Sequence, residues 1–178
     1  MDTRLIIVGD APAASYDWQD RIRNFIVTNC AVAGNTSAKL LQSLPEIKKK
    51  CPHADILMLS IGTTDIRQGN QNFPNTIIDI GKKMLSGWPA SELLLTSLFP
   101  CETGAYTLAE IEKINKHISN TAVHIGGVYM DVYTPMMRAI EAKQQLFSGK
   151  DSLLTDDGWN IWARVLLEHI AFLVEDDD

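Results

Sequence analysis

At 178 residues the chain has room for one domain with a full hydrophobic core and little room for a second, so we expect a single domain over residues 1–178. Its hydrophobic and charged contents, 46% and 21%, are ordinary for a globular protein, and no apolar run is long enough to span a bilayer. The net charge of −6 argues against nucleic acid as a partner, because phosphate binding needs a cationic surface.

The N-terminal sequence and the cysteines indicate in which compartment the protein is expected and which kinds of site it is expected to lack. Only four strongly apolar residues precede Gly9, too few for a secretory signal, so we expect a cytoplasmic protein. The three cysteines are odd in number, widely spaced and without a CxxC pair or a nearby histidine cluster, which argues against both a disulfide framework and a zinc site. We therefore expect no metal and no cofactor.

Strands and helices are predicted to alternate along the chain. Apolar runs predict strands at residues 4–9, 25–29, 55–61 and 91–98 and within 123–132. Helices are expected at 17–24, at 37–44 with a further turn from Pro45, after Pro74, at 107–119, at 135–146 and from Thr155 onward, and loops are expected at 11–16 and 67–75. Such alternation favours an α/β fold with a parallel sheet covered on both faces.

Small and acidic residues follow several of the predicted strands. The first strand closes at Gly9-Asp10, and the stretches 29–36, 62–65 and 151–158 stand at similar boundaries. Ligands in open parallel sheets bind at the carboxyl ends of the strands. We therefore expect the functional site to gather around Asp10 and Ala11.

These four stretches resemble the sequence blocks of the SGNH or GDSL hydrolases, a superfamily of esterases, lipases, acetylesterases and thioesterases. The family's Gly-Asp-Ser after a strand is similar to Gly-Asp-Ala at 9–11, and its Asn-x-x-x-x-Gly-Asp/Asn-Thr to residues 29–36. Its Gly-x-Asn-Asp is similar to residues 62–65, and its Asp-x-x-His with following Thr, Gly-Tyr and Trp-Ala to residues 151–163. The resemblance implies a three-layer α/β/α sandwich, flavodoxin-like, with a five-stranded parallel sheet.

The same resemblance implies that the catalytic groups are missing. The family's nucleophilic serine falls on Ala11, its oxyanion-binding asparagine on Thr64 and its histidine on Leu154, whereas its glycine and aspartate are retained as Gly34 and Asp151. A methyl group has no proton to lose and no lone pair with which to attack, and leucine has no nitrogen that accepts a proton. We predict no ester hydrolysis by the family mechanism.

We interpret the chain as a pseudoenzyme that binds a small acyl or ester-like ligand or a protein partner. Its expected pocket consists of Asp10, Ala11, Gly34, Asn35, Gly62, Thr64, Asp65, Asp151 and Leu154. One alternative is an atypical GDSL-type esterase that uses non-standard catalytic groups. Another is an assembly role for the outer helices, with a vestigial pocket.

Several residues within this region have two interpretations. Asp10 is either a pocket carboxylate or a turn residue that accepts backbone N–H groups. Together with Asp65 and Asp151 it would bind a cation or share raised pKa values. The candidate replacement nucleophiles are the hydroxyls of Ser15, Ser37 and Ser60, none of which has a base nearby in sequence, and the thiol of Cys30 is expected to be inert.

Overall fold

The computed structural model describes residues 3–101, 105–148 and 153–175. Its centre is a five-stranded sheet of order β2-β1-β3-β4-β5, in which every neighbouring pair of strands is parallel. These strands are β1 (Thr3–Gly9), β2 (Phe25–Asn29), β3 (Ile56–Ser60), β4 (Glu92–Thr96) and β5 (Val128–Met130). The predicted α/β fold with a five-stranded parallel sheet is thereby confirmed.

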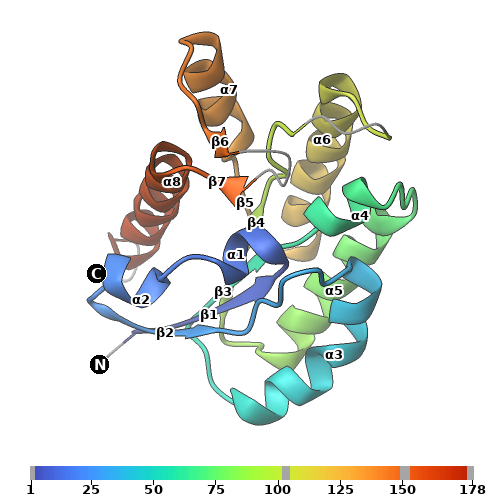
Figure 1. Ribbon diagram of the computed structural model, residues 1–178. Coiled ribbons are helices and arrows are strands. Elements are labelled where there is room, and N and C mark those ends of the chain that lie inside the picture. Colours follow the sequence, from blue (N-terminus) through green and yellow to red (C-terminus); the bar gives the residue numbers. More distant parts are fainter. Residues whose placement is uncertain (1–2, 102–104, 149–152, 176–178) are drawn as a thin grey trace.

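Helices cover both faces of the sheet and make three layers (Figure 1). One face packs against α3 (Ser37–Lys50), α5 (Phe73–Gly87) and α6 (Leu108–Ile125), and the other against α7 (Tyr133–Glu141) and α8 (Asp156–Glu175). Two short helices, α1 (Ala11–Ala14) and α4 (Thr63–Arg67), follow the ends of β1 and β3, and a third, α2 (Trp18–Arg21), lies between α1 and β2. The short strand β6 (Phe147–Ser148) pairs antiparallel with β7 (Leu153–Leu154). Among the described residues, no helix is both long and apolar enough to cross a membrane.

The central strands are apolar throughout because both of their faces are covered. In β1, Ile6 and Val8 belong to the core under α3, α5 and α6, whereas Leu5 and Ile7 belong to the core under α8. All four are at most 2% exposed. A strand buried on both sides needs apolar side chains at successive positions, which is the pattern the sequence shows.

Helix boundaries differ from the sequence prediction in several places. Residues 11–14 form α1 where a loop was expected, since Pro12 is compatible with a first helical turn. The helix predicted over 17–24 shortens to α2, and α3 runs unbroken through Pro45 to Lys50. Helix α6 continues to Ile125 because Gly126, at φ 82°, provides the left-handed residue that ends it, and its predicted capping box at Thr107 is present.

Strand β2 is an edge of the sheet, and a side chain from α2 occupies its outward-facing backbone groups. The Nε2 of Gln19 donates to the Phe25 carbonyl oxygen at 2.9 Å, and the Val27 N–H donates to Gln19 Oε1 at 3.0 Å. A neighbouring strand would make the same two bonds. The amide of Gln19 therefore stands in for a strand at an edge that would otherwise be open to pairing.

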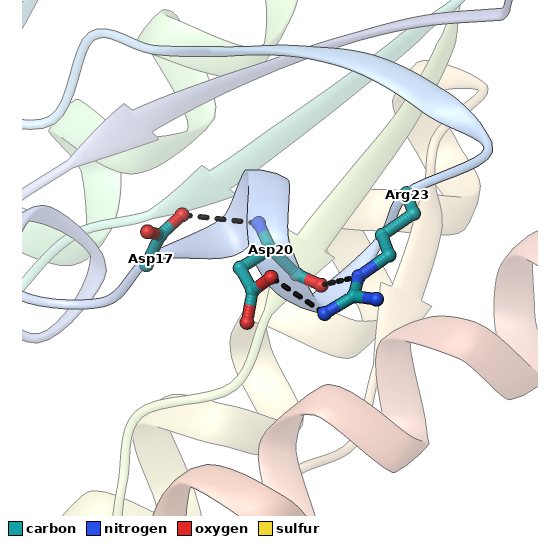
Figure 2. Close-up of polar contacts among 3 residues, drawn as sticks. All are labelled: Asp17, Asp20 and Arg23. Atoms are coloured by element: carbon teal, nitrogen blue, oxygen red, sulfur yellow. Dashed lines mark hydrogen bonds and ion pairs between the residues drawn. The ribbon is translucent and has the colours of Figure 1, made fainter.

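Helix α2 holds Gln19 in place through its own short contacts. The Asp17 carboxylate accepts the Asp20 N–H at 3.0 Å, and the Asp20 carboxylate pairs with the Arg23 guanidinium at 2.7 Å (Figure 2). Trp18 is 1% exposed, and its indole N–H donates to the Ala13 carbonyl oxygen at 3.0 Å. The buried indole anchors the helix, while the exposed ion pair adds little.

Replacing Gln19 by alanine is expected to lower the free energy of unfolding by about 1 kcal/mol, because two backbone groups lose their protein partner and turn to water. We also expect the variant to associate at high concentration through the uncovered edge. Urea denaturation and light scattering measure the two effects, with Gln71→Ala as a control at another exposed glutamine. Unchanged stability and mass in Gln19→Ala would contradict the assigned role.

Candidate functional site at the carboxyl edge of the sheet

The site begins where β1 and β3 approach each other closely. A Cβ at Gly9 would overlap the carbonyl oxygen of Ser60, so only glycine fits at the end of β1. The next residue continues the contact, since the Asp10 N–H donates to the same Ser60 oxygen at 3.1 Å. These contacts place Asp10 and Ala11 at the carboxyl edge of the sheet, as the sequence predicts.

Asp10 is fully buried and holds the start of α4 in place. Its Oδ2 accepts the Thr64 N–H at 2.9 Å, which agrees with the interpretation as a turn residue. Its Oδ1 is buried and has no hydrogen-bond partner in the described part of the chain. Burial above all, and the nearby Asp65, raise the pKa of this carboxyl from 3.8 to about 6 against the opposing effect of the Thr64 N–H.

Asp65, the second buried carboxylate, is fully engaged within the protein. Its Oδ2 accepts the Ser37 N–H at 2.8 Å, and its Oδ1 accepts the Ser37 hydroxyl at 3.0 Å and the Asn70 side-chain amide at 2.7 Å. It thus joins the start of α3 to α4 and to the loop that follows. The sequence identifies Ser37 only as one of several hydroxyl-bearing residues. Its contact with Asp65 is not predictable from sequence, because the two residues are 28 positions apart.

The polar loop predicted over 67–75 is shorter than expected and firmly attached. Only residues 68–72 lie between α4 and α5. Asn70 binds Asp65 through its side chain, and its carbonyl oxygen accepts the Tyr106 hydroxyl at 2.8 Å. These bonds hold the loop against the body of the protein and argue against its movement as a lid.

The turn after β2 lies beside α1. The Asn29 side-chain amide donates to the Ala13 carbonyl oxygen at 2.9 Å, and the Val32 N–H donates to the Gly9 carbonyl oxygen at 3.1 Å. Gly34 has a positive φ of 74°, and no atom of the described residues lies within 4 Å of the place where its Cβ would be. The structure therefore brings this turn to the same edge as Ala11 and leaves its backbone open.

Residues 62–65 lie next to Asp10. Gly62 has φ 124°, a conformation that favours glycine, and α4 begins directly after it. Thr64 is 8% exposed, and its hydroxyl has no hydrogen-bond partner among the described residues. Asn35, a predicted pocket residue within 29–36, is part of the turn after β2, where its N–H donates to the Val32 carbonyl oxygen at 3.1 Å.

Leu154 is part of the apolar core on the α8 side. It is 7% exposed and belongs to the cluster that contains Ala13, Phe99 and Trp162. The preceding Leu153 is 43% exposed and is likewise a hydrocarbon, so a shift of one position would place no nitrogen there. Asp151, the predicted triad aspartate, lies outside the described residues.

A stack of aromatic rings forms the core beside Leu154. Tyr16 stacks on Trp159 with ring centroids 4.5 Å apart, and Trp159 lies parallel to Trp162 at 5.6 Å. Trp18 and Phe99 meet Trp162 edge-on, each at 4.8 Å. The two tryptophans of α8 thus serve mainly as core, and the contribution of Tyr16 could not be read from its position in a predicted loop.

No imidazole reaches the site, although all four histidines lie in the described residues. His117 and His124 are exposed on α6, and His53 precedes β3, at the amino ends of the strands rather than at their carboxyl ends. The Nδ1 of His169 lies 2.8 Å from the carbonyl oxygen of Val165 within α8. Within residues 3–101, 105–148 and 153–175, no group of three histidine, cysteine or acidic side chains is placed to hold a metal ion.

Comparison with known proteins identifies the architecture. No family model and no curated protein matches the sequence. A member of the lipolytic protein G-D-S-L family from Veillonella parvula superposes with a TM-score of 0.79 at 18% identity, covering 93% of this chain and 97% of that one. The lipase/acylhydrolase from Enterococcus faecalis gives 0.78 at 14% identity over 94% and 95% of the two chains. A catalytic mutant of an acetylxylan esterase from Geobacillus stearothermophilus gives 0.77 at 13% identity over 94% of each chain. This chain therefore has the α/β fold of the GDSL/SGNH hydrolases.

Proposed function

We propose that the chain is a catalytically inactive protein of GDSL-hydrolase fold that binds a small acyl or ester-like ligand at the carboxyl edge of its sheet. The supporting observation is the chemistry of two positions. Ala11, the first residue of α1, offers only a methyl group, and Leu154 lies in an apolar cluster. Acyl transfer needs an attacking oxygen or sulfur and a base beside it, and neither position supplies one.

The nearby hydroxyls do not replace the missing serine. The Ser15 hydroxyl donates to the Ala11 carbonyl oxygen at 2.8 Å, and the Ser37 hydroxyl donates to Asp65. No histidine stands near either of them. Cys30 lies closer to the turn after β2, but burial raises its pKa to about 11, which keeps it a thiol at neutral pH.

The ability to bind rests on groups left available at the same edge. Among the described residues, no atom lies within 4 Å of the place where a Gly34 Cβ would be, and none forms a hydrogen bond with the Thr64 hydroxyl. We expect the Gly34 backbone and the Thr64 hydroxyl to meet a carbonyl or carboxylate oxygen of the ligand, with Ala11 as the apolar side of the site. A short acyl group that ends in an oxygen acceptor fits this combination.

Ligand binding is tested by thermal shift with short-chain carboxylates and acetylated sugars, since a ligand specific for the folded state raises the melting temperature. Thr64→Val is expected to weaken binding about two- to tenfold, the worth of one hydrogen bond, while leaving the fold intact. Thr76→Val, at a threonine in α5 away from the site, is the matched control. The binding proposal fails if no compound stabilises the protein, or if both variants lose affinity equally.

Catalytic inactivity is tested with a chromogenic acetyl ester. We expect no turnover by the unmodified protein or by Ala11→Ser alone, because a serine without an imidazole is not activated. The triple change Ala11→Ser, Thr64→Asn and Leu154→His is expected to recover measurable turnover, with circular dichroism to check that the buried Leu154 position accepts histidine. Turnover by the unmodified protein would instead favour the atypical esterase.

A further inference from the structure

Two of the three cysteines lie side by side, although they are 21 positions apart in sequence. The Sγ atoms of Cys30 and Cys51 are 3.9 Å apart, and both residues are partly exposed. Cys30 comes directly after β2, and Cys51 is the residue that ends α3. The widely spaced cysteines gave no sign of this pairing in the sequence.

Both backbones are held in place on either side of the sulfur pair. The Cys30 N–H donates to the Ile7 carbonyl oxygen at 2.7 Å. The Cys51 N–H donates to the Ile47 carbonyl oxygen at 2.8 Å, and its own carbonyl oxygen accepts the Trp88 indole N–H at 2.9 Å. A disulfide has its sulfurs about 2 Å apart, so the pair needs a further approach of about 2 Å by side-chain rotation and small backbone shifts.

We propose that Cys30 and Cys51 form a reversible intramolecular disulfide when the protein meets a disulfide oxidant such as oxidised glutathione. In the first step one cysteine thiolate attacks a sulfur of the oxidant, which forms a mixed disulfide and releases one glutathione thiol. In the second step the other cysteine attacks the protein sulfur of that mixed disulfide and releases the second glutathione. Two protein thiols are oxidised to one disulfide, and one oxidant disulfide is reduced to two thiols.

The reaction is expected to accelerate in alkaline solution. Burial, together with the neighbouring Cys51, raises the pKa of Cys30 to about 11, so its thiolate is scarce at neutral pH. The cross-link would close the segment that carries the open turn at Gly34 and the whole of α3. Because the start of α3 binds Asp65 through Ser37, oxidation would constrain one wall of the candidate site.

The experiment compares Cys30→Ser, Cys51→Ser and Cys101→Ser with the unmodified protein after incubation with oxidised glutathione at pH 8.5. The unmodified protein and Cys101→Ser are expected to lose two thiols, to show a Cys30–Cys51 link by peptide mapping, and to melt about 5–10 °C higher until dithiothreitol reverses the change. Cys30→Ser and Cys51→Ser are expected to carry at most a mixed disulfide with glutathione, and neither should gain in melting temperature.

Thiol counting on each untreated variant gives the starting number of free thiols. Circular dichroism checks that the serine substitutions leave the protein folded. The proposal is overturned if Cys101→Ser keeps both thiols after prolonged oxidation. It is equally overturned if mapping finds only glutathione adducts or links between molecules. Ligand binding at the carboxyl edge plays no part in these readouts, so they are independent of the proposed function.

Discussion

Replacing Gly9 by alanine is expected to lower the free energy of unfolding by about 3 kcal/mol or more, since overpacking against rigid backbone is among the severe classes of substitution. The new Cβ would overlap the carbonyl oxygen of Ser60, which is the atom that accepts the Asp10 N–H. To make room, β1 must move away from β3, and this breaks the hydrogen bonds between these strands. Urea denaturation followed by circular dichroism measures the loss.

Gly87→Ala is the matched control. It makes the same chemical change at the last residue of α5, where an added Cβ meets no atom within 4 Å. Alanine favours a helix over glycine, so we expect a neutral or slightly stabilising effect of up to about 1 kcal/mol. Equal losses in the two variants would mean that close approach of the strands is not the reason for glycine at position 9.

Asp10→Asn is expected to change how stability depends on pH. Folding raises the pKa of this carboxyl from 3.8 to about 6, so between these values the folded protein holds a proton that the unfolded chain has lost. The contribution of Asp10 to stability is therefore full below about pH 4 and declines as the pH rises through 6. The total decline is about 3 kcal/mol, at about 1.4 kcal/mol for each pH unit of difference.

The measurement is the free energy of unfolding of the unmodified protein minus that of Asp10→Asn, from urea titrations between pH 4 and pH 8. Asparagine stays neutral throughout, so the difference should fall with rising pH and level off above about pH 7. Asp79→Asn, at an exposed position of α5, measures the effect of removing one surface charge. A difference for Asp10→Asn that is flat, or that grows with pH, would contradict the assigned cause of the raised pKa.

The central strands β1, β3 and β4 were predictable because a strand buried on both faces has apolar side chains at successive positions. Continuous apolar runs such as Leu5 to Val8 identified the first four strands within one or two residues, and the alternation of elements identified the parallel sheet. The fifth strand was predicted only to lie within residues 123–132, and the two short strands β6 and β7 were not predicted. Helix ends were harder to predict. The end of α6 is determined by a left-handed glycine at position 126, and Pro45 is accommodated within α3 rather than at its start.

The sequence gives the chemical identity of each side chain directly. It therefore established by itself that position 11 has no hydroxyl and that position 154 has no imidazole. The contacts of these positions are not local. That Asp65 is engaged by Ser37 and Asn70, that Leu154 lies in the core, and that Cys30 lies beside Cys51 became known only from the folded chain. The physical reason is that such contacts depend on how strands and helices cross in space, whereas sequence periodicity reports only which face of each element is buried.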